Sequence, residues 1–381
     1  MWTVLFYCSA GVILYSYLGY PLLLYIFSFM RKRKPGFSPG DEPAVSIIIA
    51  AYNEEKVIVS KLKNTLALDY SPDKLQVIVA AQGSTDATVT MASSFDTVLV
   101  LQAKERKGKS AAINEAIQNA AHPVVVLTDA NTMLSTQTLK QLIAPFADEQ
   151  TGAVAGEKKV ISADGAAASG EGLYWKYESW LKQQETKFYT VVGAAGELFA
   201  LRRELFVPVP EQTITDDFFI SININFKHKK VQYAANAVST ETASASLKDE
   251  WKRKVRIAAG GIQSLFLLSK ALNPFLYPLL AFQFFSHRVL RWVFCAPALF
   301  LLFITNSILA FTGPVVFFWL LVLQVTFYVF AFAGWMLAKN NRSFFLFNIP
   351  FYIVFMHAAM LAGIVRYANG QQSVLWEKAQ R

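Results

Sequence analysis

The sequence has little cysteine, with 2 cysteines in 381 residues. Both of them, Cys8 and Cys295, lie in long apolar runs, which excludes a disulfide framework and a thiolate metal site. No internal repeat, low-complexity tract, basic helix or aromatic platform motif is visible. We therefore expect no nucleic-acid partner, although the formal net charge is +9.

Charge is absent from the N-terminal segment. No charged residue occurs from Trp2 to Met30, and the basic run Arg31 to Lys34 comes directly after it. This length crosses a bilayer and lacks a small-residue cleavage site, so we predict an uncleaved transmembrane helix over residues 1–31 rather than a secretion signal. By the positive-inside rule, the basic run places the next part of the chain in the cytoplasm. Basic residues there attract anionic lipid head groups, each by about 1 kcal/mol.

The last third of the chain is also strongly apolar. Three runs have spanning length: 289–311, 314–337 and 344–365. Basic residues flank the first two runs: Arg288 and Arg291 lie at the start of the first, and Lys339 and Arg342 follow the second. This charge pattern predicts two spans with cytoplasmic flanks. The third contains Pro350, so a full span and an interfacial element both remain open. Residues 288–366 are thus a predicted transmembrane region of two to three spans, followed by a basic tail, 367–381, in a multi-pass protein of the inner or plasma membrane.

Between these regions the pattern is that of an α/β domain, predicted at 44–260 after a linker at 32–43. Short apolar runs alternate with helical segments, which is typical of a Rossmann-like, mostly parallel sheet. Asn53 is the expected cap of the helix that ends near Leu66. The predicted strands are 45–49, 75–80, 98–101 and the run from Val124.

That last strand ends at a carboxylate. Val124 to Leu127 are continuously apolar, as in a buried parallel strand, and Asp129 and Asn131 come after them. Because ligands bind beyond the carboxyl ends of such strands, their oxygens would hold Mg²⁺ or Mn²⁺ together with substrate phosphates. Alternatively, Asn131 or Ser135 simply caps the next helix.

Polar residues after the other strands converge on the same sheet edge. Tyr52 can stack on a base, and Glu54 and Asp86 can accept hydrogen bonds from a base or ribose. Lys107 and Lys109, on a glycine-containing turn before a helix, can hold phosphates. Such a basic turn alone is usually only a solvated surface. The functional interpretation therefore depends on all of these residues meeting at one edge of the sheet.

The order and spacing of these motifs resemble a known family. Residues 46–55, 83–86, 107–109 and 129–131 are similar to its nucleotide loop, second nucleotide turn, phosphate-side turn and metal motif. The family is the membrane-embedded kind of family 2 GT-A glycosyltransferases, which includes cellulose, hyaluronan and poly-N-acetylglucosamine synthases. The resemblance extends from Val45 to about Leu265 and implies a cytoplasmic GT-A domain flanked by transmembrane helices.

The resemblance also implies a catalytic base. Thr215-Asp216-Asp217 resembles a motif whose last carboxylate, Asp217 here, takes the proton of the acceptor hydroxyl, with Asp216 on the acceptor side. One positioned carboxylate contributes typically 10²–10⁴-fold to such a reaction. Thr215 and Asp216 can at the same time cap the following helix.

Three further segments match parts of the family. Residues 192–203 resemble a glycine-rich strand with an arginine pair that borders the acceptor site, which implies roles for Gly193, Gly196 and Arg202. Aromatic residues of the preceding helix, 171–187, are expected to pack rather than to stack on sugar. Trp376 in the basic tail resembles a C-terminal element that helps hold the donor or acceptor, which requires a cytoplasmic tail.

The last motif departs from the family. A Gln-x-x-Arg-Trp motif appears here as Arg253-x-x-Arg256-Ile257, so the diphosphate-binding arginine is kept and the tryptophan that stacks on a polymer end is absent. Gln82 replaces an aspartate that contacts the nucleotide, which weakens the assignment of UDP. Asn131 replaces a second metal-binding aspartate. An amphipathic interfacial segment, 261–287, comes next in the chain.

The implied function is an inverting, metal-dependent glycosyltransferase that uses Mg²⁺ or Mn²⁺. Its donor is a nucleotide sugar, with UDP the expected nucleotide, and its acceptor is a lipid-linked or growing glycan. The missing tryptophan and the few spans favour a lipid-linked acceptor. The alternative is a catalytically weak sugar-nucleotide-binding or polymer-export subunit, because Gln82 and Asn131 would fit a loss of activity.

Overall fold

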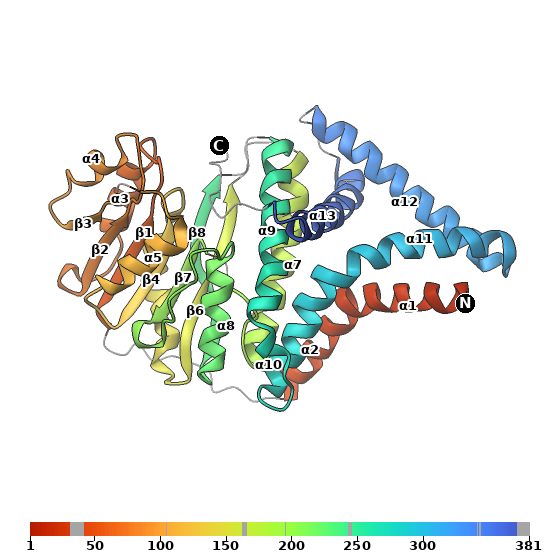
Figure 1. Ribbon diagram of the computed structural model, residues 1–381, viewed down its shortest axis with the longest axis horizontal. Coiled ribbons are helices and arrows are strands. Elements are labelled where there is room, and N and C mark those ends of the chain that lie inside the picture. The colour runs from red at the N-terminus through yellow and green to blue at the C-terminus, as the bar shows by residue number, and fades with distance from the viewer. Residues whose placement is uncertain are drawn as a thin grey trace.

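A computed structural model gives the architecture of the chain. It describes residues 1–30, 42–103, 105–161, 166–194, 196–242, 246–340, 342 and 344–371. An α/β part lies beside a set of long helices, several of which extend away from the sheet (Figure 1). Trp376 and most of the predicted tail lie outside the described residues, as does most of the predicted linker.

A mixed, mostly parallel sheet of eight strands forms the α/β part, in the order β3-β2-β1-β4-β7-β6-β8-β5. The strands are β1 Val45–Ala50, β2 Leu75–Ala80, β3 Val98–Leu101, β4 Val124–Asp129, β5 Met133–Leu134, β6 Thr151–Ile161, β7 Leu198–Arg202 and β8 Lys230–Thr242. Strands β1 to β4 are parallel where they pair, and β7 pairs antiparallel with both β4 and β6. The predicted α/β fold class is confirmed.

The strand register aligns the polar loops. Ala50 at the end of β1 is paired with Ala80 of β2 and with Asp129 of β4. The three parallel strands therefore end at one level, and the loops after them meet at one edge of the sheet. This is the edge that the sequence predicted as the ligand site.

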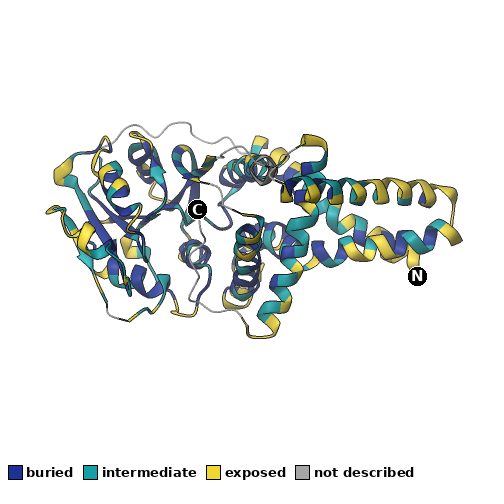
Figure 2. Cartoon of the chain, turned by 90° about the horizontal axis from the view of Figure 1, so that it is seen from above, coloured by how far each residue is buried: buried dark blue, intermediate teal, exposed yellow. Residues whose placement is uncertain are grey.

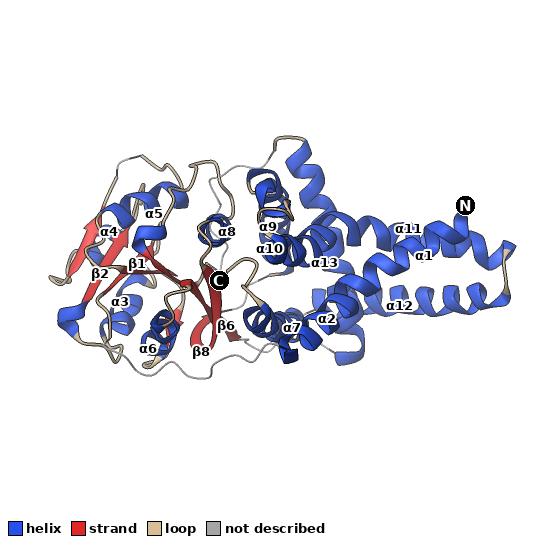
Figure 3. Cartoon of the chain, turned by 90° about the horizontal axis from the view of Figure 1, so that it is seen from below, coloured by secondary structure: helices blue, strands red, loops and turns tan. Residues whose placement is uncertain are grey.

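Helices cover both faces of the sheet (Figure 3). They are α3 Ile58–Leu66, α4 Thr88–Ala92, α5 Lys109–Gln118, α6 Thr138–Ile143, α7 Ala166–Phe188 and α8 Asp216–Phe226, while α9 Leu247–Leu267 lies farther from the sheet. Alternate residues of β1 serve two cores: Ile48 packs with α5 and α8, and Ile47 packs with α3 and α6. Burial on both faces explains why the strands are continuously apolar.

Asn53 does not cap α3, contrary to the prediction, because the helix begins four residues later, after Val57. Asn53 instead adopts a left-handed conformation with φ of 54°. Its Oδ1 accepts a hydrogen bond of 2.8 Å from the backbone N–H of Thr85. Asn53 thus joins the loops after β1 and β2, a role to which short polar side chains in this conformation are suited.

Four helical segments are long and apolar enough to cross a membrane: Trp2–Phe29, Pro278–Thr312, Val315–Lys339 and Phe345–Ala368. They contain α1 Trp2–Leu14, α2 Tyr20–Met30, α10 Pro278–Phe284, α11 Cys295–Thr312, α12 Val315–Lys339 and α13 Phe345–Ala368. Helices α1, α11 and α12 extend away from the sheet and carry many exposed residues (Figures 1 and 2). Helix α10 begins inside the predicted interfacial segment, 261–287, and continues through the π-helical turns Phe285–Phe294 into α11.

Helix α13 is packed closely on α9 of the α/β part. A Cβ atom at Gly363 would lie 2.4 Å from Cβ of Ala258, so the two backbones approach through a glycine. Pro350 lies inside α13 and does not end it. The third apolar run is therefore one helix in direct contact with the part of the chain that carries the predicted site.

Candidate active site

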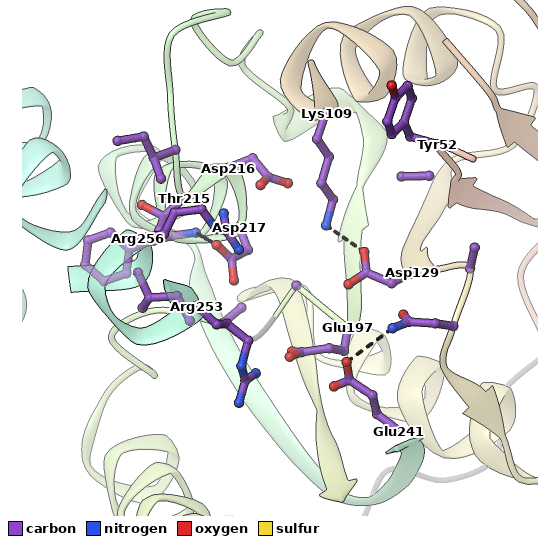
Figure 4. A pocket seen from close by; sticks show the side chains of 18 of the residues that line it. Tyr52, Lys109, Asp129, Glu197, Thr215, Asp216, Asp217, Glu241, Arg253 and Arg256 are labelled. Carbon is purple, nitrogen blue, oxygen red and sulfur yellow. Dashed lines mark hydrogen bonds and ion pairs between the residues drawn. The ribbon is translucent and has the colours of Figure 1, made fainter. Parts of the chain in front are cut away.

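A cavity of about 1250 Å³ lies where the sheet edge faces α7, α8, α9 and α13. Most of the predicted site residues line it: Tyr52, Glu54, Gln82, Asp86, Lys109, Asp129, Asn131, Gly193, Gly196, Asp216, Asp217, Arg253 and Arg256. Figure 4 shows Asp216 and Asp217 facing Lys109 and Asp129 across this space. Residues far apart in the sequence thus share one cavity.

Tyr52 and Asp86 define one end of the cavity, after β1 and β2. The guanidinium carbon of Arg106 lies 3.7 Å from the centre of the Tyr52 ring. Asp86 accepts hydrogen bonds from the backbone N–H groups of Thr88 at 3.0 Å and Glu55 at 3.2 Å. The aspartate thereby holds the two loops and the start of α4 in place.

Gln82 has an unsatisfied acceptor. Its Nε2 donates a hydrogen bond to Glu115, while its Oε1 is buried and accepts no hydrogen bond in the described part of the chain. Burying an unpaired polar atom costs free energy, so such an atom at a cavity wall marks a place where a ligand N–H group can bind.

Asp129 ends β4 and pairs with Lys109 of α5, whose Nζ lies 2.6 Å from Asp129 Oδ1. Burial lowers the pKa of Lys109, but the charges of Asp129 and Asp216 outweigh it and hold this pKa above its ordinary value. Lys109 is therefore a cation throughout the neutral pH range. A fixed ammonium beside a carboxylate is suited to binding a diphosphate.

The residues at the end of β4 fit a divalent metal that a substrate would help to coordinate. Asn131 Nδ2 donates a hydrogen bond of 3.3 Å to Glu241 Oε1, which leaves its amide oxygen as an acceptor at the cavity. No cluster of three histidine, cysteine, aspartate or glutamate side chains suited to a metal occurs among the described residues. One carboxylate and one amide oxygen match the way Mg²⁺ is held with substrate phosphates.

Lys61, which the sequence did not single out, lies beneath Asp129. It is fully buried, and its Nζ donates hydrogen bonds to Thr128 Oγ1 at 3.0 Å and to the Thr132 carbonyl at 2.7 Å. Burial lowers the pKa of Lys61 to about 7, while the charge of Asp129 opposes this shift. These bonds hold the turn that carries Asp129 and Asn131.

Asp217 lies in the first turn of α8. Burial, and then the charge of Asp216, raise the pKa of Asp217 to about 7. Its Oδ1 accepts a hydrogen bond of 2.8 Å from the backbone N–H of Phe218. A Cβ atom at Gly196 would lie 3.3 Å from Asp217 Oδ2, so a glycine there leaves space beside the carboxylate.

Arg253 and Arg256 reach the cavity from α9. Arg253 donates two hydrogen bonds of 3.0 Å to the carboxylate of Glu250. Burial lowers the pKa of Arg256, and the charge of Asp216 opposes this shift. A guanidinium group stays charged in proteins, so Arg256 adds a cation to the wall near Asp217.

Two predicted residues are not among the described residues that line the cavity. Lys107 is exposed, and its neighbour Arg106 lines the cavity instead. Arg202 donates hydrogen bonds to the carbonyls of Thr151 at 2.9 Å and Phe146 at 2.8 Å. It thus supports the strands from behind.

The structure also brings residues to the cavity that sequence reasoning missed. Glu197 and Glu241 line it, and Lys158 pairs with both of them, at 2.5 Å from Glu197 Oε1. Lys182, Arg288 and Trp175 line the cavity from helices. The sequence offers no periodic signal for them: Trp175 belongs to a helix whose aromatic residues are expected to pack, and the position of Arg288 before an apolar run is typical of a membrane flank.

Comparisons with known proteins agree with this geometry. The model of glycosyl transferase family 2 matches residues 46–207. A poly-beta-1,6-N-acetyl-D-glucosamine synthase of Staphylococcus aureus is 25% identical over 278 residues, which cover 70% of this chain and 66% of that protein. A beta-monoglucosyldiacylglycerol synthase of Nostoc sp. is 27% identical over 238 residues, 59% of this chain and 50% of the relative. The chain thus spans two thirds or less of these relatives.

A solved structure has the same fold over nearly the whole chain. The mannosyltransferase from Pyrobaculum calidifontis, solved with GDP-Man and Mn²⁺, has a TM-score of 0.76 at 21% identity. The match covers 98% of this chain and 100% of that one. The predicted family resemblance and enzyme class, glycosyltransferase, are confirmed. The chain therefore carries a family 2 glycosyltransferase domain of the GT-A fold and is related to polysaccharide synthases.

Proposed function

We propose that the protein is an inverting, metal-dependent glycosyltransferase that moves a sugar from a nucleotide donor to a lipid-linked or glycan acceptor. The observation that carries this proposal is the cavity itself. It holds a carboxylate whose pKa is raised to about 7, Asp217, opposite the Lys109–Asp129 pair. A base on one side and diphosphate-binding groups on the other are the two halves of a displacement at an anomeric carbon.

Asp217 takes the proton of the acceptor hydroxyl as its oxygen attacks the anomeric carbon from the face opposite the nucleotide. The bond from that carbon to the diphosphate oxygen breaks, and its electron pair leaves with the nucleoside diphosphate. Lys109 and Arg256 stabilise the charge that develops on the diphosphate. Asp129 and Asn131 would hold Mg²⁺ or Mn²⁺, which supplies further positive charge to the leaving group.

We propose UDP as the nucleotide. Gln82 Oε1 has no donor in the described part of the chain, and the ring N–H of uracil is a donor of the required kind. Tyr52 offers an aromatic face at the same end of the cavity, where Arg106 now lies against it. The Mn²⁺ of the solved neighbour supports the use of a divalent metal.

The direct test is Asp217→Asn, which keeps the shape of the side chain and removes the base. We expect transfer to fall by about 10²–10⁴-fold while UDP affinity, measured by calorimetry, stays within a few-fold. Asp96→Asn is the matched control, because Asp96 is exposed and is not one of the described residues that line the cavity. Turnover retained in Asp217→Asn would mean that another group is the base.

A further inference from the structure

Lys182 of α7 is a buried cation at the cavity wall, and it has no partner of opposite charge among the described residues. Its side chain is 6% exposed, and it has no hydrogen bond or ion pair with any residue that the structure describes. Two aromatic rings lie near it, those of Trp175 and Tyr233, each 5.6 Å from its Nζ. Burying an unpaired ammonium is costly, so its retention at a cavity wall indicates a ligand.

The carboxylates around Lys182 do not compensate it. Burial lowers the pKa of Lys182, and the charges of Glu178, Glu197 and Glu157 oppose that shift without reversing it. None of these carboxylates forms an ion pair with Lys182 in the described part of the chain: Glu178 pairs with Arg291 at 2.6 Å, Glu197 pairs with Lys158 at 2.5 Å, and Glu157 accepts hydrogen bonds from the neutral hydroxyl of Ser179 at 2.8 and 2.9 Å. The ammonium group of Lys182 therefore has no direct anionic partner among the described residues.

A second cation, Arg288, lines the same cavity. Its guanidinium donates hydrogen bonds of 2.8 and 2.6 Å to the neutral carbonyl of Val192, and it forms no ion pair in the described part of the chain. The charge of Arg288 lowers the pKa of Lys182, which places the two cations within electrostatic range of each other. Two such cations facing one space suit an anionic group.

Apolar side chains line the cavity beside these cations. Met356, Ala359 and Met360 come from α13, and Trp292 comes from the helical segment Pro278–Thr312. Both helical segments are long and apolar enough to cross a membrane. A ligand that contacts them can extend from the polar cavity along helices whose surfaces suit lipid chains.

We infer that the acceptor is an anionic lipid, whose phosphate binds Lys182 and Arg288 and whose apolar chain lies on α13. This inference rests on the proposed function and deepens it, because it names the acceptor class. A neutral polysaccharide would leave both cations without a partner. An anionic lipid would pair both cations through its phosphate and would contact the apolar side chains of α13 through its chain.

The test is binding of three matched probes to the full chain in a non-ionic detergent, measured by native mass spectrometry. The probes are dioleoyl phosphatidic acid, dioleoylglycerol, which lacks the phosphate, and glycerol 3-phosphate, which lacks the lipid. We expect one phosphatidic acid per chain, bound at least about tenfold more tightly than either other probe. Lys182→Gln should remove most of this preference, and Lys182→Arg should restore it.

Lys176→Gln is the control for general attraction of lipids to a basic protein, because Lys176 is exposed on the same helix. Equal binding of phosphatidic acid and dioleoylglycerol, or an equal loss in Lys176→Gln and Lys182→Gln, would overturn the inference. Glycerol 3-phosphate binding as tightly as phosphatidic acid would overturn the lipid part. The measurement needs no donor, metal or turnover, so it can fail while the proposed transfer stands, and it can succeed where transfer fails.

A second readout is thermal unfolding. Because the charge of Lys182 is buried without an ion-pair partner in the described part of the chain, Lys182→Met should raise the melting temperature of the unliganded protein while it weakens phosphatidic acid binding. A lower melting temperature with unchanged binding would show that Lys182 serves the fold.

Discussion

Asp217 is the residue on which the proposed chemistry depends. A general base works best when its pKa is near the working pH, and burial together with the charge of Asp216 raises this pKa to about 7. In the proposed mechanism, Asp216 would thus act by tuning the pKa of the base. Gly196 contributes space beside Asp217, since a Cβ atom there would crowd its Oδ2.

The raised pKa predicts a pH profile. The base must be deprotonated, so kcat/KM should fall tenfold per pH unit below a limb set by Asp217. Asp216→Asn removes the like charge and should move this limb to lower pH at fixed metal concentration. A limb at the same pH in both proteins would contradict the assignment of Asp217.

The raised pKa of Asp217 also disfavours folding at neutral pH. The stability that protonated Asp217 contributes is present below pH about 4 and is lost as the pH rises through about 7.

Residues tied to an element end could be predicted from the sequence. Asp129 ends a strand that begins with four apolar residues, and Asp217 lies in the first turn of a helix, so their places follow from local pattern. Arg106 and Lys107 share a turn without periodicity, and only tertiary contact with Tyr52 shows which one faces the cavity. Arg288 and Arg291 have the sequence positions of membrane flanks, but Arg288 lines the cavity and Arg291 is buried against Glu178.

At the scale of elements, continuous strands were more predictable than helix ends. Strands β1 and β2 occur where the apolar runs predicted them, because burial on both faces leaves a direct signal in the sequence. Strand β3, at the edge of the sheet and partly exposed, also occurs where its apolar run predicted it. The predicted start of α3 is wrong: asparagine is common both at helix caps and in loops, and Asn53 joins the loops after β1 and β2 instead of capping the helix. The strands after β4 pair across long separations, which no local pattern specifies.

The contact between α9 and α13 shapes the cavity, because Arg256 and Ile257 line it from α9 and Met356 and Met360 from α13. Gly363→Val should force these helices apart, since even a Cβ atom would lie 2.4 Å from Ala258. We expect a loss of about 1–3 kcal/mol in the free energy of unfolding and a raised KM for the acceptor.

The matched control for Gly363→Val is Gly11→Val, because no described residue outside the adjacent backbone of α1 comes within 4 Å of the position that a Cβ atom would take at Gly11. Thermal unfolding and acceptor KM would be measured for both variants in the same detergent. Equal effects of the two substitutions would contradict a specific role for the α9–α13 contact.

At the scale of the whole molecule, buried polar contacts join the long helices to the catalytic part. Glu185 of α7 accepts a hydrogen bond of 2.7 Å from the Tyr20 hydroxyl of α2 and lies 2.7 Å from Nδ1 of His287. Glu178 of the same helix pairs with Arg291 at 2.6 Å. Helix α7 is therefore held to both the N-terminal helix and the segment Pro278–Thr312, and it also lines the cavity. The same helix, α7, thus lines the candidate active-site cavity and is bonded to two of the candidate membrane spans.

We propose that the α/β part lies on the cytoplasmic face, because a basic run, Arg31 to Lys34, comes directly after the first apolar helix. Nucleotide sugars would then reach Tyr52 and Asp129 from the cytoplasm. An acceptor held against α13 would approach Asp217 from the membrane side. One cavity would in this way receive a soluble donor and a membrane-bound acceptor.

The most direct test of this account is to incubate membranes that contain the protein with radiolabelled UDP- and GDP-sugars, with and without Mn²⁺ or Mg²⁺. We expect incorporation from a UDP-sugar that chelation of the metal abolishes and that Asp217→Asn lowers by about 10²–10⁴-fold. The label should extract into organic solvent, as a lipid-linked product does. No metal-dependent incorporation from any donor would contradict the proposed transfer and favour a sugar-nucleotide-binding subunit, and label in high-mass, glycosidase-sensitive material would contradict the lipid acceptor.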